Sequence, residues 1–569
     1  MELLKIFKRE YKNLLIIFVI FLMNVFLFKC KMYNLNTDFG REAYFPAIMA
    51  DGAVLYKDIF NTFICPFSYI FNAILIKLFG HSLNVLFITG AANAFAITGG
   101  IYLLSREFLN KTISMAIALF IIFYSCFYTG LMNYITPYSY AVVYGLCAVV
   151  FSLFFYTLYL KHTNTSFLYT AFIFSGIAAS CKYEFILYSF ILFIIFFLSK
   201  PELKKTVLSI LFFLVIPFVC VLTLYLQGLA LTDLQNYFEI LKRFVHHPYL
   251  QKVYATSFFF DIRAFITSLK NFITITAVTG IVFFLYKKSD ETKNKIYPVL
   301  LTVLSVFLLI LCLCCVKFLE FCVYDAVSYL PVFVFILAAV KIKEIVKDRA
   351  VLLITMASLA VSAKCFWYFA NNFYGRYFLP VLIIALFIII FRFFCKPEYQ
   401  KYLQKSLIFI MAVLALSSFR LNLVGLVLKN TVIKTQAGKI YARKTEAQIY
   451  NNVLHFVNEQ TKPDETIAVL GAAPLINFLT SRNSVNFYNH FDEAIAGAYG
   501  ESKIIEGYSK NMPDYFIIFC NTDKNYDFCH TYGQNICKFV QSSYIEELSV
   551  KLKGTNDYAL IYKNKRVDK

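Results

Sequence analysis

Acidic and basic side chains gather in one short stretch near the N-terminus, TDFGREAYFPAIMADGAVLYKDIFN, which begins a few positions after an almost purely apolar run. If DFGREAYF is helical, Asp38 and Glu42 lie four residues apart on one face, where two like charges repel by roughly 0.2–0.5 kcal/mol. Arg41 stands beside them, and a cation, a metal ion or a substrate proton between the acids would remove the conflict. Lys57 and Asp58 follow after a glycine turn. The stretch thus offers an acid that can take up a proton and a base that can hold a phosphate.

The alternative interpretation of this stretch is a solvated loop with incidental surface charges. Aromatic side chains are interleaved with the charges, namely Phe39, Tyr44, Phe45 and Tyr56. Rings in these positions favour a folded loop that is packed against the rest of the protein. We therefore expect an ordered loop that carries chemistry just outside a membrane.

The elements that must position this loop are membrane helices. Of 569 residues, 60% are hydrophobic and 19% aromatic, whereas soluble domains are about 45–50% apolar, so the expected fold class is a polytopic α-helical membrane protein. The first apolar run has no small-residue cleavage site and is expected to be a retained span. The net charge is +20, yet residues 429–569 hold 17 basic and 15 acidic residues. The excess therefore lies in short loops of the apolar part, as the positive-inside rule requires, and nucleic acid is not an expected partner.

Thirteen apolar segments approach the roughly 20 residues needed to cross a bilayer. They lie near residues 12–30, 83–104, 112–129, 138–160, 167–181, 183–198, 206–226, 268–286, 297–316, 324–340, 350–368, 376–395 and 406–428. The short pair around Lys182 could instead be one long tilted helix, which would reverse the parity of every later span. Basic residues fall in alternate loops, so the N-terminus is expected in the cytoplasm and, after thirteen spans, the C-terminal part outside.

Two outer loops are long, at residues 31–82 and 227–267. The first contains PFSYIFNAILIKLFG, which is too short to span and is expected in the interface or against the bundle. Residues 1–430 are expected to form the catalytic membrane domain and residues 431–569 an extracytoplasmic α/β domain. The latter contains the predicted helices KTEAQIYNNVLHFVNEQ and PLINFLTSR and the predicted strands ETIAVLG, PDYFIIF and DYALIYKN. It has no GxGxxG, P-loop or DxD motif, so we expect a cap or acceptor-docking role.

Four features of the chain together carry a resemblance. They are the outer loop that opens with D-x-x-R after the first span, the segment GAVLYKDIFNTFICPFSYIFNAILIKLFG, the segment NFYGRYFLPVLI and the segment NFLTSRN. They resemble the GT-C superfamily of bacterial membrane glycosyltransferases, and within it family 39, the protein mannosyltransferases and lipid A aminoarabinose transferases. The resemblance implies inverting transfer of a sugar from a polyprenyl-phosphate donor to a lipid, glycan or protein acceptor. It places this reaction on the outer face of the bacterial inner membrane.

The resemblance also implies roles for the two acids of the first loop. Asp38 is expected to be the general base that deprotonates the acceptor. Many relatives carry adjacent Asp-Glu in this motif, whereas here Phe39 follows Asp38. Glu42 could fill the place of the second acid from one turn further on, or the two acids could share the role.

The donor phosphate is expected to be bound by basic side chains. The resemblance implies Lys57, from GAVLYKD, near the phosphate, and Arg376 could serve the same leaving group because a guanidinium binds phosphate in a planar fork. Tyr377 beside it, and Arg41 and Asp58 in the first loop, complete the expected substrate contacts there.

Other polar residues in the apolar part are candidates too. Lys182 and Glu184 lie at the outer end of a span pair, where a charged side chain is either a site residue or an anchor for the first loop. Arg420 is expected to snorkel to the outer surface. Tyr134, in an uncharged outer loop, is a candidate sugar contact by its position alone.

A metal ion is not obviously required for this chemistry, although a divalent metal remains an open alternative. His246 and His247 in the second long loop could bind one with an acid from the first, or they could be ordinary loop residues. Clustered cysteines in one span lie too deep in lipid for an ordinary zinc site. Three cysteines fall in the polar part, and a disulfide between two of them is one interpretation: Cys520, Cys529 and Cys537.

Two other functions compete with the enzyme. A transporter or flippase of lipid-linked sugars would show internal symmetry and Gly/Pro-broken spans in corresponding places. The sequence has neither, and its charges gather at one face. A scaffold that recruits partners through the C-terminal part is a third interpretation.

Overall fold

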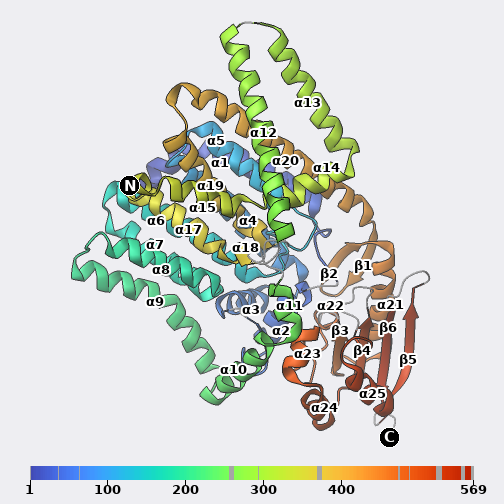
Figure 1. Cartoon of the computed structure of the whole chain (residues 1–569). Helices are drawn as coiled ribbons and strands as arrows, with labels where there is room; N and C mark the ends of the chain where they lie inside the picture. Colours follow the sequence, from blue (N-terminus) through green and yellow to red (C-terminus); the bar gives the residue numbers. More distant parts are fainter. Residues whose placement is uncertain are drawn as a thin grey trace.

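The computed structural model describes residues 2–35, 38–62, 65–255, 262–292, 294–367, 374–471, 475–485, 487–520, 528–552 and 558–565. A large bundle of helices is joined to a smaller α/β domain, the tail domain, which lies at one end of the bundle (Figure 1). The protein is therefore a polytopic α-helical membrane protein with a C-terminal α/β domain. The bundle comprises α1 (Glu2–Phe28), α4 (Leu83–Arg106), α5 (Lys111–Ile121) with η1 (Ile122–Cys126), α6 (Tyr140–His162), α7 (Thr165–Cys181), α8 (Glu184–Phe197), α9 (Leu203–Leu226), α12 (Ile262–Thr292), α13 (Ile296–Cys314), α14 (Val316–Glu320) with η2 (Phe321–Asp325), α15 (Leu330–Val340), α16 (Ile342–Ile345), α17 (Arg349–Val361), α18 (Ala363–Trp367), η3 (Tyr374–Phe378), α19 (Leu379–Ile389), η4 (Ile390–Phe394), η5 (Pro397–Tyr399) and α20 (Gln400–Leu428).

Each of the thirteen predicted spans falls on one helix or on two or three consecutive helical segments. Within the described residues, eight helical segments are long and apolar enough to cross a membrane, and α14–η2 with α15 makes a ninth if this pair, bent by 49°, is one span. The remaining four predicted spans coincide with shorter apolar helices, which are α5–η1, α7, α8 and α17. The number thirteen, and the orientation that follows from it, stay predictions.

The chain around Lys182 is a helical hairpin. Lys182 is extended, with φ −158° and ψ 146°, and separates α7 from α8. The two helices run antiparallel and side by side, because Ser175 Oγ lies 2.8 Å from Ser189 Oγ and the rings of Phe172 and Phe193 are 4.7 Å apart. The alternative of one long tilted helix is therefore wrong.

The first outer loop is folded. It contains α2 (Phe39–Ala50), which is buried along almost its whole length, and α3 (Phe67–Phe79). The hydroxyl of Tyr144 on α6 donates to Asn72 Oδ1 at 2.6 Å, so α3 packs against the bundle, as one of the two predicted alternatives had it. The alternative of a solvated loop is wrong, because α2 lies between the bundle and the tail domain (Figure 1).

The second long loop is also helical over its described part. It contains α10 (Leu231–Val245) and α11 (Pro248–Ala255), and α10 packs against α23 (Glu493–Tyr499) of the tail domain. Aromatic rings join the two outer loops and the tail domain: Phe60 lies 5.5 Å from Tyr237 and 5.3 Å from Tyr499. The two loops and the tail domain thus form one packed outer layer.

The tail domain is built on a four-stranded sheet of order β3-β4-β6-β5, in which β3 (Ile467–Gly471) and β4 (Tyr515–Cys520) are parallel. The antiparallel strands are β5 (Tyr544–Lys551) and β6 (Tyr558–Asn564). A Cβ at Gly471, where φ is +90°, would lie 2.1 Å from the carbonyl oxygen of Phe519, so the turn after β3 requires glycine. Helices around the sheet are α21 (Lys444–Gln460), α22 (Leu475–Thr480), α23, α24 (Glu501–Lys510) and α25 (Gln534–Ser543).

The predicted tail elements are confirmed as α21, β3, α22, β4 and β6. The elements not predicted from the sequence are β5, α23 to α25, and the hairpin of β1 (Thr431–Thr435) and β2 (Gly438–Ala442), whose short strands lack a strong alternating pattern. A disulfide, which was one interpretation of the three cysteines in this part of the chain, joins Cys529 to Cys537.

Hydrogen bonds fix the tail domain to the first outer loop. The amide of Tyr441 donates to the carbonyl of Cys30 at 2.8 Å, and the hydroxyl of Tyr450 donates to the carbonyl of Leu35 at 2.6 Å. These contacts bring residues about 400 positions apart into one layer.

Candidate active site

The two acids at the start of α2 share one cation, which the chain itself supplies. Arg41 Nη1 lies 2.7 Å from Asp38 Oδ1, and Arg41 Nη2 lies 3.3 Å from Glu42 Oε1. The guanidinium also lies over the ring of Tyr138, 5.6 Å from its centre. The predicted repulsion between the acids is therefore relieved by Arg41. We call Asp38, Arg41 and Glu42 the α2 acid site.

Glu42 is locked in place by neighbours. Its side chain is fully buried, its Oε1 accepts from the Tyr69 hydroxyl at 2.9 Å, and its Oε2 accepts from the Tyr140 amide at 2.8 Å. Burial raises the pKa of Glu42, while Arg41 and the hydrogen bonds act in the opposite direction. Both oxygens are occupied, so Glu42 is placed to orient Arg41 and to tie α2 to α3 and α6.

Unlike Glu42, Asp38 has a carboxylate oxygen that is available to a bound molecule. Its side chain is 16% exposed, and its Oδ2 accepts no hydrogen bond from the described residues. Asp38 precedes the first turn of α2 without capping it through its side chain. Of the two acids, only Asp38 can therefore take up a proton from a bound molecule without losing a structural hydrogen bond.

The tail domain contributes two further groups that the sequence analysis missed. His490 Nε2 lies 3.7 Å from Asp38 Oδ1, and His490 Nδ1 is buried with no hydrogen-bond partner in the described part of the chain. Burial lowers the pKa of His490 to about 4, so its ring is neutral at pH 7. Asp492 accepts from the amide of Ile495 at 2.7 Å, and burial raises its pKa to about 6.

The histidine and aspartate of NHFDEA carried no motif in the sequence. The same strip of the tail domain is joined to α2 at a second point, where the amide of Ser484 donates to the Tyr44 hydroxyl at 2.9 Å. The tail domain therefore closes over the α2 acid site rather than standing apart from it.

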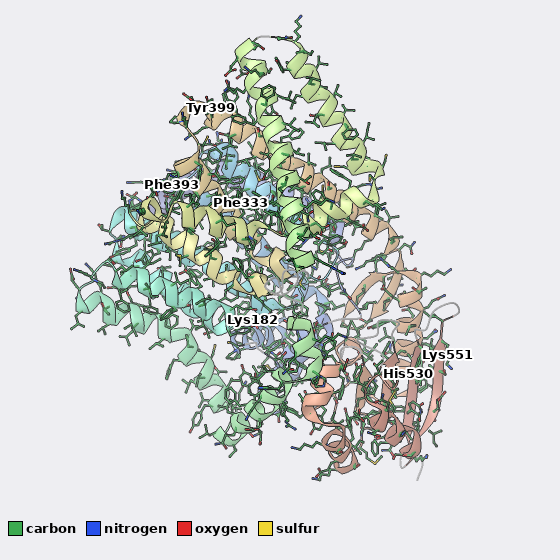
Figure 2. The ribbon with its side chains drawn as sticks, in the orientation of Figure 1. Lys182, Phe333, Phe393, Tyr399, His530 and Lys551 are labelled. Atoms are coloured by element: carbon green, nitrogen blue, oxygen red, sulfur yellow. A yellow bond between two sulfur atoms is a disulfide. The ribbon has the colours of Figure 1, made fainter. Side chains whose placement is uncertain are left out.

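The hairpin tip carries a second charged group near the first loop. Lys182 Nζ lies 3.7 Å from Glu184 Oε2, and Glu184 Oε1 lies 3.4 Å from Lys364 Nζ, a residue of α18 that the sequence did not reveal. Burial lowers the pKa of Lys182 to about 8, and its charge also interacts with Arg41 and Glu42. The tip is anchored to the first loop because the amide of Cys65 donates to the carbonyl of Cys181 at 3.1 Å. Figure 2 shows Lys182 on the side of the bundle that faces the tail domain.

Lys57 and Asp58 make structural contacts away from the α2 acid site. Asp58 Oδ2 accepts from the amide of Val54 at 2.8 Å and so closes a tight turn. Lys57 is exposed and donates to the carbonyl of Gly228, between α9 and α10, at 3.3 Å. Within the described residues, no hydrogen bond or ion pair joins either residue to the α2 acid site.

Arg376 lies in an aromatic cage. Its guanidinium is 4.6 Å from the ring centre of Tyr124 and 4.0 Å from that of Tyr128, and it donates to the carbonyls of Tyr124 and Val323. These contacts hold together η1, η2 and η3. Part of the segment before Arg376 that carried the resemblance lies outside the described residues.

Tyr134 and Tyr377 support the α2 acid site from behind. Their rings are stacked, the hydroxyl of Tyr134 donates to the carbonyl of Tyr377 at 2.9 Å, and the hydroxyl of Tyr377 accepts from the amide of Tyr138 at 3.1 Å. Tyr138 in turn contacts Arg41. Both tyrosines are fully buried in this structure, and direct contacts of Tyr134 with a sugar and of Tyr377 with a substrate stay predictions.

Metal ligands do not converge in the described part of the chain, where no three His, Cys, Asp or Glu side chains are placed to hold an ion. His246 Nδ1 lies 2.8 Å from the carbonyl of Lys242, and His247 Nδ1 accepts from the amide of Tyr249 at 3.3 Å. The two histidines therefore serve the turn between α10 and α11.

Comparison with known proteins gives a likeness of fold. No family model and no curated protein sequence matches the chain. ArnT from Cupriavidus metallidurans, solved with undecaprenyl phosphate, has a TM-score of 0.52 and 10% identity over 96% of this chain and 97% of its own. The oligosaccharyltransferase of Archaeoglobus fulgidus, solved with zinc and sulfate, has a TM-score of 0.50 and 13% identity over 98% of this chain and 73% of its own. The chain thus shares its overall fold with these two proteins, and the resemblance seen in the sequence led to the same kind of fold.

Proposed function

We propose that this chain is a membrane glycosyltransferase of the GT-C type that moves a sugar, with inversion, from a polyprenyl-phosphate donor to a lipid, glycan or protein acceptor. The observation that carries the proposal is the α2 acid site, where Asp38 is partly exposed and held by Arg41 while Glu42 is fully engaged. The fold adds support, because ArnT was solved with undecaprenyl phosphate and the archaeal neighbour is an oligosaccharyltransferase.

In the proposed reaction Asp38 accepts the proton of the acceptor hydroxyl or amine as that atom attacks the anomeric carbon. The bond between the anomeric carbon and the phosphate oxygen breaks, and the lipid phosphate leaves with the electron pair. Arg41 fixes the orientation of the Asp38 carboxylate through its 2.7 Å contact. Positioning and charge neutralisation supply most of the catalysis, because phosphate is a fair leaving group.

The departing phosphate needs a cation. The Arg376 guanidinium donates to backbone carbonyls and lies against tyrosine rings, and the Lys57 ammonium donates to the carbonyl of Gly228. The charge of Lys182 interacts with Arg41 and Glu42, and Lys364 lies on the other side of Glu184. We assign the donor phosphate to Lys182 and Lys364, which both lie beside Glu184 at the hairpin tip and would exchange that carboxylate for the phosphate, in place of the pair that the sequence favoured.

The acceptor enters beneath the tail domain. His490 is neutral, its Nε2 lies 3.7 Å from Asp38 Oδ1, and its Nδ1 has no hydrogen-bond partner among the described residues, so the ring can donate to or accept from an acceptor hydroxyl or amine. The tail domain then forms one wall of the active site, in addition to the expected role in docking the acceptor. Contacts between the protein and the sugar of the donor determine whether a hexosyl or a pentosyl group is transferred.

The proposed orientation has the N-terminus in the cytoplasm and the tail domain outside a bacterial inner membrane. The disulfide Cys529–Cys537 supports an outside tail domain, because disulfides persist in oxidising compartments. The basic loops at the other end of the bundle agree with this orientation.

The proposal is tested in membranes that carry the wild type, Asp38→Asn or Asp51→Asn at matched levels. Asp51→Asn is the control, because it makes the same chemical change at the exposed far end of α2. The wild type and Asp51→Asn are expected to consume radiolabelled polyprenyl-phosphate sugar and to label an acceptor, whereas Asp38→Asn does neither. Redistribution of the lipid-linked sugar between leaflets, at equal rates in all three, would instead support a transporter.

A further inference from the structure

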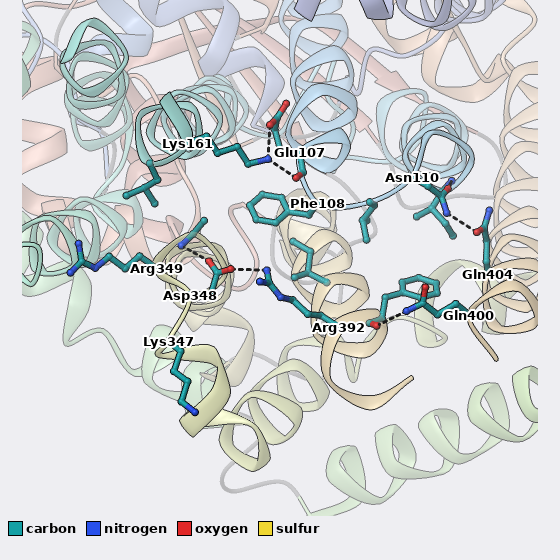
Figure 3. A pocket seen from close by; sticks show the side chains of 16 residues that line it. Glu107, Phe108, Asn110, Lys161, Lys347, Asp348, Arg349, Arg392, Gln400 and Gln404 are labelled. Carbon is teal, nitrogen blue, oxygen red and sulfur yellow. Dashed lines mark hydrogen bonds and ion pairs between the residues drawn. The ribbon is translucent and has the colours of Figure 1, made fainter. Parts of the chain in front are cut away.

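A wide, open cavity of about 1020 Å³ lies at the end of the bundle away from the tail domain. Its walls come from the turn between α4 and α5, the end of α6, the turn between α16 and α17, the segment of α19 and η4, and the start of α20 (Figure 3). Figure 2 places Phe393 and Tyr399, neighbours in sequence of two lining residues, far from His530 and Lys551 of the tail domain. We call this the basic cavity.

The charges that line the basic cavity are unbalanced. Four basic and two acidic side chains line it: Lys161, Lys347, Arg349, Arg392, Glu107 and Asp348. Lys161 Nζ lies 2.8 Å from Glu107 Oε2, and Arg392 Nη1 lies 2.6 Å from Asp348 Oδ2 (Figure 3). Both acids are therefore neutralised, and two positive charges remain.

The remaining charges belong to Lys347 and Arg349. Both side chains are exposed, and neither side chain makes a hydrogen bond or ion pair with any other described residue, although the charge of Lys347 also acts on Glu344. Arg392 also has donor capacity left, because one guanidinium nitrogen serves Asp348 while the group carries five N–H donors. Arg392 thus offers free donors inside the cavity, and Lys347 and Arg349 add two cationic side chains at its rim that extend away from Arg392 (Figure 3), so an anion can be bound without breaking an ion pair of the protein.

The backbone around the basic cavity adds to this field. Three helices begin at its wall, α5 at Lys111, α17 at Arg349 and α20 at Gln400, and the partial positive charge of a helix lies at its N-terminus. The carbonyl of Glu107, beyond the end of α4, accepts from Lys161 Nζ at 2.7 Å, so this negative helix end is neutralised.

The lining is amphipathic. Leu109, Ile113, Leu160, Ile388 and Phe391 stand beside the charged groups. The volume is far larger than a free phosphate ion fills and is in the range of a site for a drug-sized molecule. A phosphate that is attached to a glycerol backbone and acyl chains matches both the charges and the apolar wall.

We propose that the basic cavity binds the phosphate of an anionic phospholipid headgroup in the leaflet opposite the transfer reaction. Basic pockets between membrane helices on the cytoplasmic side are a recognised means of holding anionic headgroups. A bound headgroup would connect five separate parts of the bundle and stabilise their arrangement. This site is independent of the α2 acid site, so its test does not depend on the proposed reaction.

The test uses the purified full-length protein in a neutral detergent, and the melting temperature is followed as ligand is added. The probes are phosphatidylglycerol, phosphatidylcholine of the same chain length, and inorganic phosphate. Lys347→Gln/Arg349→Gln removes the two unpaired charges. Lys343→Gln/Lys396→Gln removes two exposed charges from neighbouring segments that do not line the cavity.

Phosphatidylglycerol is expected to raise the melting temperature of the wild type and of the control, while phosphatidylcholine does not. In Lys347→Gln/Arg349→Gln the concentration of phosphatidylglycerol for half of the shift should rise roughly ten-fold or more. An equal shift with inorganic phosphate, lost in the same variant, would keep the phosphate site and assign it to a soluble anion. Equal titrations for site variant and control, or no shift at all, would overturn the proposal.

Discussion

Two buried acid clusters of similar composition lie in different parts of the molecule. On α1, Glu10 Oε1 accepts from Arg9 and Arg106, at 2.9 and 3.2 Å, and its Oε2 accepts from Asn13 and from the Tyr102 hydroxyl. At the α2 acid site a single arginine holds two acids, and Asp38 Oδ2 accepts nothing from the described residues. Both clusters combine carboxylate, arginine and tyrosine, so composition alone does not separate a structural cluster from a reactive one.

The difference lies in unused hydrogen-bonding capacity. Glu10 is 2% exposed and has four donors, which is what a structural carboxylate in a membrane bundle requires. Asp38 is 16% exposed, has one close donor, and faces a histidine whose ring is not fully hydrogen-bonded. The comparison indicates that the Glu10 cluster joins α1 to α4, whereas at the α2 acid site one oxygen of the Asp38 carboxylate is available to a substrate.

The largest effect on stability is expected from Arg41→Gln. It leaves Glu42 buried without its cation, and loss of one partner of a buried pair costs about 3–5 kcal/mol in unfolding free energy. Arg9→Gln is the matched control, because Arg9 is 56% exposed and Glu10 keeps Arg106. Melting temperatures in detergent should fall clearly for Arg41→Gln and little for Arg9→Gln. Equal decreases in melting temperature for the two variants would contradict the proposed difference between the α2 acid site and the Glu10 cluster.

Glu10→Gln is expected to lower stability and to leave catalysis intact. The amide cannot accept from both arginines and Tyr102 as the carboxylate does, and the loss of charged hydrogen bonds costs about 1–3 kcal/mol. The melting temperature and the rate of sugar transfer per folded molecule are measured together. A large loss of rate in protein that remains folded would contradict a purely structural role for Glu10.

Lys182→Gln is expected to raise the KM for the lipid-linked donor roughly ten-fold, because a charged hydrogen bond to phosphate is worth about 1.5–3 kcal/mol. Lys57→Gln is the matched control and is expected to leave that KM unchanged, since Lys57 contacts Gly228. The opposite result, with KM raised by Lys57→Gln alone, would restore the assignment made from the sequence.

His490→Asn should flatten the dependence of stability on pH. The folded pKa of His490, about 4, is below its ordinary value of 6.5, so between these pH values the unfolded chain binds a proton that the folded chain does not. Stability in the wild type therefore falls as the pH drops from about 6.5 to 4, by up to about 1.4 kcal/mol per pH unit.

The raised pKa of Asp492 makes the folded state more stable as the pH falls from about 6 to 4. This contribution is present in both the wild type and His490→Asn. The difference in melting temperature between His490→Asn and the wild type, measured across this range, isolates the histidine. A constant difference would mean that His490 is not held neutral.

Much of the fold follows from local sequence patterns. Apolar runs predicted the positions of the membrane helices, and alternation in ETIAVLG and PDYFIIF predicted β3 and β4, because burial imposes a period that can be seen within one segment. The break at Lys182 could not be decided that way, since both a hairpin and a tilted helix suit the same composition. Contacts between Ser175 and Ser189 decided it.

The candidate site was predictable only where its residues are close in sequence. The group of Asp38, Arg41 and Glu42 lies within one helical turn, so its spacing was visible. His490 reaches this group, and Lys364 reaches Glu184 at the neighbouring hairpin tip, from distant parts of the chain, and no local pattern encodes such contacts. The contact of Lys57 with Gly228 was not visible in the sequence for the same reason, because Gly228 lies in a different outer loop, and a role for Lys57 at the donor phosphate stays a prediction.

The central claim is that Asp38 is the reactive acid and Glu10 the structural one. The most direct test compares the initial rate of sugar transfer per folded molecule for Asp38→Asn and Glu10→Gln in the same membranes. The account predicts a loss of about 10²-fold or more for Asp38→Asn, the range for a lost general base, and a near wild-type rate for Glu10→Gln. A near wild-type rate for Asp38→Asn in folded protein would contradict the account.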